Sequence, residues 1–171
     1  HGTITLGGGS WASSARGQYA LAFDGSSTYV DMSPASQPQV EDDQTVSFWF
    51  MYPTAPGGAQ NMISRSGGAG GSFIGFHDGI SGCGGMGLGV WNFAGPFIAC
   101  TTSFPSVNTW HHLVYTYNGT TNTLYIDGSI ASSSTTNINT GTIDNFDIGR
   151  YVGGNEYFQG KLDELRIYSR A

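Results

Sequence analysis

From Gln44 to Tyr52, the side chains alternate strongly between two faces, which is the pattern of a β-strand. Val46, Phe48 and Phe50 fall on one side, and Trp49 falls on the other. Successive side chains of a strand point to opposite faces, whereas those of a helix rotate by about 100° per residue. The segment is therefore predicted to be a β-strand with one face in a hydrophobic core.

Shorter apolar runs recur along the chain between Gly, Pro and Asp-Gly turn signals, and none has a sustained helical period. The run from Trp110 to Tyr117 leads into Asn118-Gly119, and residues 123–127 then form its predicted hairpin partner. This pattern predicts an all-β, two-layer antiparallel β-sandwich, with residues 1–171 as one domain. The predicted strands are residues 19–23, 29–32, 44–52, 62–65, 73–77, 86–93, 110–117, 123–127, 129–132, 144–150 and 162–168.

The composition excludes two classes of partner. Only 11% of the residues are charged and the formal net charge is −6, with six Lys and Arg residues in total. No basic stripe is present to neutralise phosphates, so we expect no nucleic-acid partner. No apolar run approaches the roughly 20 residues of a membrane span. The acidic balance suits a hard cation such as calcium, although a negative charge also serves solubility alone.

Cys83 and Cys100 lie in one Gly-rich region and leave three alternatives: a disulfide, two free thiols or part of a metal site. Their spacing matches no zinc motif, which favours the disulfide. A disulfide indicates an oxidising compartment, so we predict a secreted, extracellular protein. No signal peptide is visible, and we expect the sequence to be a mature or excised piece of a larger protein.

A series of motifs along the chain is similar to a known family. They are Ala20–Gly25 with Tyr29-Val30, Thr45–Phe50, Trp110–Tyr117, Leu124–Gly128, and Ile148–Arg150 with Phe158–Tyr168. In this order they resemble the laminin-G-like, concanavalin A-like jelly-roll domains. The sequence differs from the family pattern at the first strand, which is missing or altered, and between Cys83 and Cys100. The family includes lectins, adhesion modules and accessory domains of polysaccharide-degrading enzymes, so the fold alone does not assign a function.

The resemblance implies a structural Ca2+ ion, held by an Asp near the last strand and by the first turn. The matching positions are Asp163 and the turn at Asp24 and Gly25. Calcium accepts carboxylate and backbone oxygens in a loose geometry. The alternative is that Asp24 caps its own turn, while Asp163 pairs with Lys161 or Arg166.

The side chains that alternate with the predicted core define a candidate ligand-binding face. Gly75, Gly87 and Gly89 lie among them, and we expect their missing side chains to leave a groove. Aromatic rings beside a groove suit carbohydrate, because sugars stack their C–H faces on aromatic planes. The alternative for Trp49 and His112 is packing beneath edge loops. The strand candidates are His77, Trp91, Trp49, His112 and Tyr125, and the loop candidates are Asn92, Tyr151, Glu156 and Tyr157.

No catalytic residue is predicted. A retaining glycosidase needs two carboxyl groups about 5 Å apart, and neither Glu41–Asp43 nor Asp163-Glu164 has a suitable spacing. The Gly-x-Ser-x-Gly motif of α/β-hydrolases is absent. His111 and His112 are adjacent on a strand and point to opposite faces, so they do not chelate one zinc ion together.

The leading hypothesis is a non-catalytic, lectin-like module that binds glycan or polysaccharide, contains a structural calcium and belongs to a secreted multidomain protein. A second hypothesis is a protein–protein adhesion or spacer domain. A third is a divergent polysaccharide lyase or glycoside hydrolase on the same fold.

Overall fold

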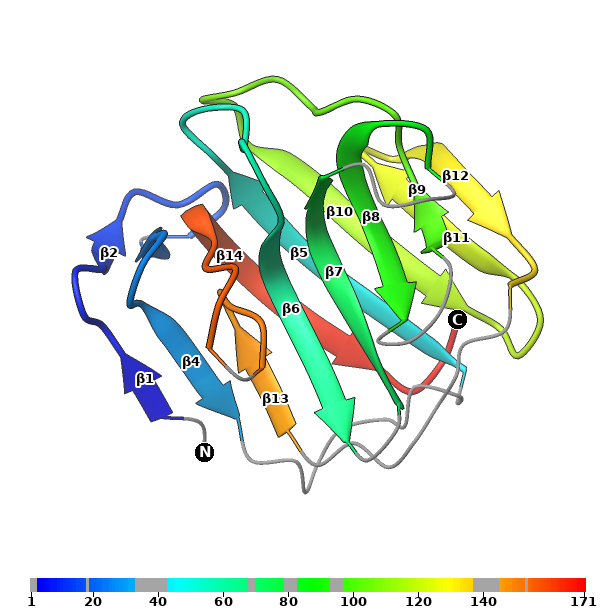
Figure 1. Cartoon of the computed structure of the whole chain (residues 1–171), viewed down its shortest axis with the longest axis horizontal. Coiled ribbons are helices and arrows are strands. Elements are labelled where there is room, and N and C mark those ends of the chain that lie inside the picture. The colour runs from blue at the N-terminus through cyan, green and yellow to red at the C-terminus, as the bar shows by residue number, and fades with distance from the viewer. Residues whose placement is uncertain are drawn as a thin grey trace.

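The computed structural model describes residues 3–17, 19–32, 43–67, 70–78, 83–92, 97–136, 145–152 and 154–171 (Figure 1). These residues form strands, turns and irregular segments, and they include no helix that could span a membrane. The strands are β1 Thr3–Thr5, β2 Ser10–Ala12, β3 Ala20–Asp24, β4 Tyr29–Met32, β5 Gln44–Met51, β6 Gln60–Gly67, β7 Gly70–Asp78, β8 Met86–Asn92, β9 Phe97–Cys100, β10 His111–Tyr117, β11 Asn122–Ile126, β12 Ser129–Ser134, β13 Asn145–Ile148 and β14 Gln159–Tyr168.

The described strands pair into two seven-stranded antiparallel sheets that stack face to face (Figure 1). Sheet A has the strand order β1-β4-β13-β6-β7-β8-β9, and sheet B has the order β12-β11-β10-β5-β14-β3-β2. The predicted two-layer β-sandwich is confirmed. Each sheet therefore has one inner face on the core and one outer face directed away from the other sheet.

The alternation along β5 places its side chains as the sequence predicts. Val46, Phe48 and Phe50 are fully buried between the sheets, and Trp49 lies on the outer face of sheet B. The same alternation, applied to the other predicted strands, assigns eight more residues to the core, and all eight join the core or pack against it. The core of the described residues includes Ile74, Phe76, Leu88, Val90, Leu113, Tyr115 and Leu124, with Ile126 packed at its margin.

Three strands were not predicted, and each lies at the edge of a sheet. Strands β1 and β9 are the two edges of sheet A, and β2 is an edge of sheet B. They are three or four residues long. A run this short carries too few alternating positions to distinguish it from a loop. The altered first strand is thus a short edge strand, and the segment between the cysteines contains the interior strand β8 and the short edge strand β9.

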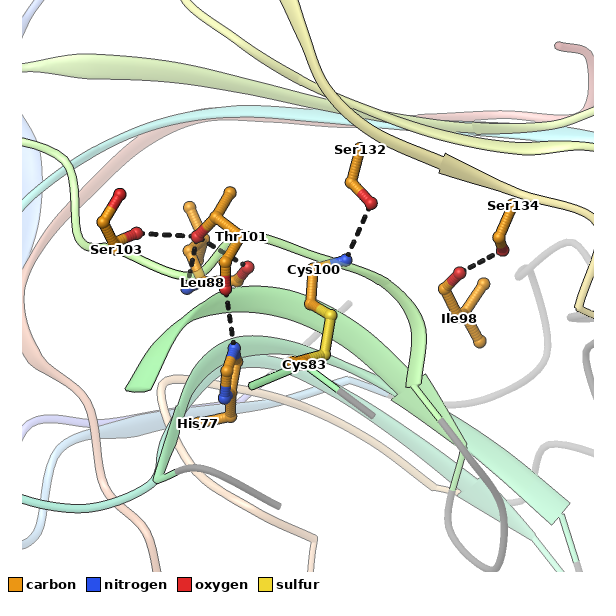
Figure 2. The surroundings of a disulfide bond; sticks show 9 residues. All are labelled: His77, Cys83, Leu88, Ile98, Cys100, Thr101, Ser103, Ser132 and Ser134. Atoms are coloured by element: carbon orange, nitrogen blue, oxygen red, sulfur yellow. Dashed lines mark hydrogen bonds between the residues drawn. A yellow bond between two sulfur atoms is a disulfide. The ribbon is translucent and has the colours of Figure 1, made fainter. Parts of the chain in front are cut away.

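The two sheets are joined along one side of the sandwich. The Cys100 N–H donates a 3.1 Å hydrogen bond to the Ser132 hydroxyl, which connects β9 of sheet A with β12 of sheet B (Figure 2). The Ser134 hydroxyl donates to the Ile98 carbonyl between the same two strands. These contacts close the sandwich at this edge.

The opposite side of the sandwich is open. A cavity of about 220 Å³ enters between the sheets there. Trp11 and Tyr19 stand at its mouth with 59% and 66% of their surfaces exposed. Its apolar walls come from inward-facing residues of both sheets, namely Leu21, Phe23, Val30, Ile148 and Leu162.

Candidate functional site

The two cysteines form a disulfide at the end of sheet A that carries β8 and β9 (Figure 2). Their Cα atoms are 6.0 Å apart, and the bridge ties the segment before β8 to the end of β9. The imidazole of His77 lies beside it, with Nε2 3.3 Å from the Thr101 carbonyl oxygen. Two sulfurs joined to each other are not thiolates, so this group does not provide the ligands of a zinc site.

The predicted ligand-binding residues lie on two opposite faces, not on one. His77 and Trp91 lie on the outer face of sheet A. Trp49, His112 and Tyr125 lie on the outer face of sheet B. Alternation identified the outward side of each strand correctly, but it does not tell which of the two sheets a strand joins. The prediction of a single face is therefore wrong.

Among the described residues, the glycines of the expected groove lie against neighbouring chain segments. A Cβ atom on Gly75 would collide with the backbone of Gln60, and one on Gly87 would collide with the backbone of Thr101. A Cβ atom on Gly89 would overlap Cys100. These glycines allow neighbouring chain segments to approach closely, which explains their missing side chains without a ligand groove.

On the outer face of sheet A, five ring-bearing residues form what we call the sheet A aromatic cluster. The ring centroids of Phe73 lie 5.9 Å from Trp91 and 5.2 Å from Tyr151. Phe97 lies 5.8 Å from Trp91 and 4.5 Å from His77. Phe73 and His77 are fully buried, whereas Trp91 and Tyr151 are partly exposed. The exposed part of the cluster is thus a Trp and a Tyr supported by a phenylalanine between them.

The segment between β13 and β14 folds over this face beside the cluster. The Val152 N–H donates a 2.9 Å hydrogen bond to the Ser64 hydroxyl on β6. The Asn61 side-chain amide donates to the Glu156 carboxylate at 2.5 Å, and the Asn61 N–H donates to the Glu156 carbonyl at 2.9 Å. These bonds hold Tyr151 in position and leave the polar edge of the segment beside the aromatic rings.

Two loop candidates lie outside the cluster. Asn92 shares the inward side of β8 with Leu88 and Val90, and only 4% of its surface is exposed. Tyr157 makes a side-chain hydrogen bond to Arg150, whose guanidinium also bonds to Asp147 at 2.7 Å. We therefore exclude both residues from the candidate site on sheet A.

The outer face of sheet B contains a separate cavity of about 320 Å³, which we call the sheet B pocket. The Trp49 indole and the His112 imidazole are 4.9 Å apart with an interplanar angle of 31°. The Ser47 hydroxyl lies 2.9 Å from Nε2 of His112. The pocket is lined by Arg16, Ser47, Trp49, His112, Glu164 and Arg166.

A β-bulge and a loop bring the charged residues of the pocket together. The pairing of β14 with β5 shifts between Asp163 and Arg166, and Glu164 adopts a φ of 52° there. This places Glu164 beside Arg166, and their side chains form an ion pair. The loop before β3 crosses the same face, where the Ala15 N–H donates to the Asp163 carboxylate at 3.2 Å.

Arg16 follows in that loop, with its guanidinium 5.8 Å from the centre of the Trp49 ring. Sequence reasoning missed Arg16 and Arg166 as candidates. Arg16 is distant from Trp49 in the sequence, so local patterns do not connect them. Arg166 depends on the bulge at Glu164, which contains no Gly that would predict a bulge.

The surroundings of His112 favour its neutral form. Burial lowers the pKa of His112 below its ordinary value; the Asp127 carboxylate acts against this shift, and the positive charge of Arg16 adds to it. The imidazole is available as a neutral hydrogen-bonding group near pH 7.

The carboxylate of Asp24 caps the turn that follows β3. Its Oδ1 accepts the N–H groups of Ser26, Ser27 and Thr28 at 3.0, 2.8 and 2.9 Å. Its Oδ2 accepts the Ser27 hydroxyl at 2.5 Å and the Gly8 N–H at 3.0 Å. Burial acts to raise the pKa of Asp24, but these hydrogen bonds outweigh it and hold the pKa far below its ordinary value.

The predicted calcium ligands do not fit one ion. Asp24 pairs with Gln159 on β14, and Asp163 lies four residues farther along that strand. Four residues of strand span about 13 Å, whereas two oxygens sharing one calcium lie within about 5 Å of each other. The shared site at Asp24, Gly25 and Asp163 is not formed. A calcium ion held by other ligands stays a prediction.

One further hydrogen-bonded row was not foreseen. The Ser106 hydroxyl lies 3.1 Å from Nε2 of His111, and Nδ1 of His111 lies 2.7 Å from the Asp127 carboxylate. Burial acts to raise the pKa of Asp127, but hydrogen bonds from His111 and His112 outweigh it and lower the pKa. Nε2 of His111 also lies 2.9 Å from the backbone carbonyl of Ser106. Because Nε2 contacts this carbonyl and Ser106 is exposed, we interpret the row as structural. Through His111 it connects the loop at Ser106 with the turn at Asp127.

Comparison with known families identifies the chain. A family model described as the concanavalin A-like lectin/glucanases superfamily matches residues 24–171. The chain belongs to this superfamily. Membership in the concanavalin A-like superfamily agrees with the two antiparallel sheets and with the motifs quoted from the sequence. No curated protein sequence matches the chain.

Solved structures share the concanavalin A-like fold. One is domain 4 of AbnA, a GH43 extracellular arabinanase from Geobacillus stearothermophilus in complex with arabinotriose, with a TM-score of 0.77, 21% identity, and coverage of 99% of this chain and 82% of that chain. Another is Trypanosoma rangeli sialidase in complex with the inhibitor DANA, with a TM-score of 0.64 and 18% identity. The match covers 95% of this chain and 27% of the sialidase chain. A third is the heptameric SAP-like pentraxin from Limulus polyphemus, with a TM-score of 0.64 and 16% identity. The match covers 89% of this chain and 76% of the pentraxin chain.

Proposed function

We propose that the chain is a non-catalytic, glycan-binding module of a secreted protein, and that it binds carbohydrate at the sheet A aromatic cluster. The partly exposed Trp91 and Tyr151, supported by Phe73, carry this proposal. Aromatic faces of this kind stack against the C–H faces of sugar rings. Trp91 lies on strand β8, and Tyr151 lies in a segment held by hydrogen bonds, so little ordering is needed on binding. Glu156 and its neighbours supply hydrogen-bonding groups at the edge of the rings.

The comparisons support the same proposal. The superfamily includes lectins and glucanases in its description. The arabinanase domain that shares this fold was solved in complex with arabinotriose. The disulfide supports secretion, because such bonds persist in oxidising compartments.

The chemistry beside the cluster favours binding over hydrolysis. Glycoside hydrolysis uses two carboxyl groups that flank the scissile bond, about 5 Å apart or more. The Glu156 carboxylate beside the cluster accepts from the Asn61 amide, and Asp147 on the same face pairs with Arg150. A panel of polysaccharides incubated with the protein is expected to release no reducing sugar.

Affinity electrophoresis in gels containing arabinan and other polysaccharides tests the binding proposal. At least one polysaccharide is expected to retard the protein, and Trp91→Ala is expected to weaken the retardation tenfold or more. Trp11→Ala is the matched control, since Trp11 is an exposed tryptophan at the opposite edge of the molecule. No retardation by any polysaccharide would refute glycan binding. Loss of binding in Trp11→Ala with normal binding in Trp91→Ala would move the site to the open side of the sandwich.

A further inference from the structure

The sheet B pocket concentrates positive charge in an acidic chain. The sequence has six Lys and Arg residues and a formal net charge of −6, yet two of these six line this one cavity. Elsewhere, Arg65 is fully buried and Arg150 pairs with Asp147. Two arginines around one cavity make it a candidate binding site for an anionic ligand.

Of the two arginines, Arg16 provides the unbalanced charge. Arg166 pairs with Glu164 at the rim of the pocket. Arg16 is exposed and forms no ion pair with the residues that the structure describes. His112 is neutral near pH 7 because its pKa is lowered. The six lining residues therefore carry one positive charge in excess, and the Asp163 carboxylate on the same face, outside this lining, accepts the Ala15 N–H.

The floor of the pocket suits a ring with hydroxyl groups. Trp49 and His112 form a tilted aromatic pair, and the Ser47 hydroxyl lies against the imidazole. The Glu164 carboxylate can accept hydroxyl protons at the rim. A volume of about 320 Å³ is at the small end of ligand cavities, which run from about 300 to 1,000 Å³. A single sugar ring matches this volume better than a polymer segment.

We propose that the sheet B pocket is a second binding site, selective for a sugar that bears one carboxylate, such as a uronate residue. Its carboxylate pairs with the Arg16 guanidinium, while its hydroxyls bond to Ser47, His112 and Glu164. One excess positive charge matches a carboxylate better than a doubly charged phosphate. The site lies on the face opposite the sheet A aromatic cluster and does not depend on the function proposed there.

Calorimetric titrations at constant ionic strength test the proposal with four probes: D-glucuronate, D-glucose, glucose 6-phosphate and acetate. Glucuronate is expected to bind at least tenfold more tightly than each of the other three. Arg16→Ala is expected to weaken glucuronate binding at least tenfold and to leave the melting midpoint unchanged, because Arg16 is exposed in a loop. Arg170→Ala is the matched control, since Arg170 is exposed near Tyr168, outside the pocket.

Each contrary result overturns a stated part of the proposal. Equal binding of glucose shows that charge plays no part, and equal binding of acetate shows that the sugar ring plays none. Tighter binding of glucose 6-phosphate contradicts the choice of a single carboxylate. Equal losses in Arg16→Ala and Arg170→Ala would indicate a general electrostatic effect. Trp91→Ala is expected to bind glucuronate normally, so failure at either site leaves the other proposal standing.

Discussion

The backbone N–H of Gly8 donates a 3.0 Å hydrogen bond to Oδ2 of Asp24, and so ties the turn after β1 to the turn after β3. The same carboxylate accepts three N–H groups of its own turn. One side chain thus organises two turns at the open side of the sandwich, where short edge strands supply few other hydrogen bonds.

Asp24→Ala is expected to lower the free energy of unfolding by roughly 1–3 kcal/mol, because several N–H groups lose their shared charged acceptor. Urea unfolding measures the change. The wild type should also lose stability as the pH falls below about 4, the ordinary pKa of an Asp, because the folded state holds this pKa lower and binds fewer protons than the unfolded state. Asp43→Asn, an exposed carboxylate, is the control. Equal midpoints for Asp24→Ala and the wild type would contradict the assigned role.

Calcium is not expected to act through Asp24. The effect of Asp24→Ala on the melting midpoint should be the same with excess calcium and with a chelator. A ligand that binds only the folded state raises the midpoint, so a calcium effect present in the wild type and absent in Asp24→Ala would show that Asp24 binds the ion.

Gly149→Ala is expected to be strongly destabilising for a steric reason. Gly149 has a φ of 86°, and a Cβ atom there would overlap the ring of buried Phe23. Gly154 has a φ of 100°, and a Cβ atom there meets nothing within 4 Å, so Gly154→Ala tests backbone strain alone. We expect Gly149→Ala to lose at least about 2 kcal/mol more than Gly154→Ala by urea unfolding, since overpacking adds to the strain. Similar losses would show that the ring moves aside.

His112 is expected to make stability depend on pH near neutrality. Its folded pKa is lowered, so the unfolded state binds more protons between that pKa and about 6.5. Stability should therefore be fully present above about pH 6.5 and decline as the pH falls toward the folded pKa. Comparing melting midpoints of the wild type and His112→Gln from pH 7.5 to 5 measures this, and the variant should show a smaller decline. Parallel curves would assign the pH dependence elsewhere.

The disulfide is expected to stabilise the chain by roughly 3 kcal/mol through its constraint on the unfolded state. The double variant Cys83→Ser and Cys100→Ser should lose this amount in urea unfolding under oxidising conditions. Thiol reductant should lower the wild-type stability to that of the double variant and leave the variant unchanged. A loss in the variant upon reduction would point to a reductant effect unrelated to this bond.

The sequence predicted the parts of the fold that depend on local alternation. Val46, Phe48 and Phe50 were assigned to the core, and Trp49 to the outside, because a strand exposes alternate residues. Asn92 was misplaced although its position two residues after Val90 on one strand indicates the inward side. That error was avoidable from the same rule.

The site itself depended on information that alternation does not contain. Trp49 and Trp91 are both outward residues, but they lie on opposite faces because β5 and β8 join different sheets. Arg16 reaches Trp49 through a loop contact between Ala15 and Asp163, which are 148 positions apart. Contacts of this range follow from strand order, and one sequence read locally does not specify strand order.

The back-to-back arrangement of the two sheets determines how the two proposed sites would act together. A stiff polysaccharide on the sheet A aromatic cluster cannot bend around the sandwich to enter the sheet B pocket, so the two proposed sites would take separate chains. A molecule with both sites occupied would act as a crosslink, in which binding at one face raises the effective concentration at the other. The thickness of the sandwich would fix the spacing between the polymers it joins.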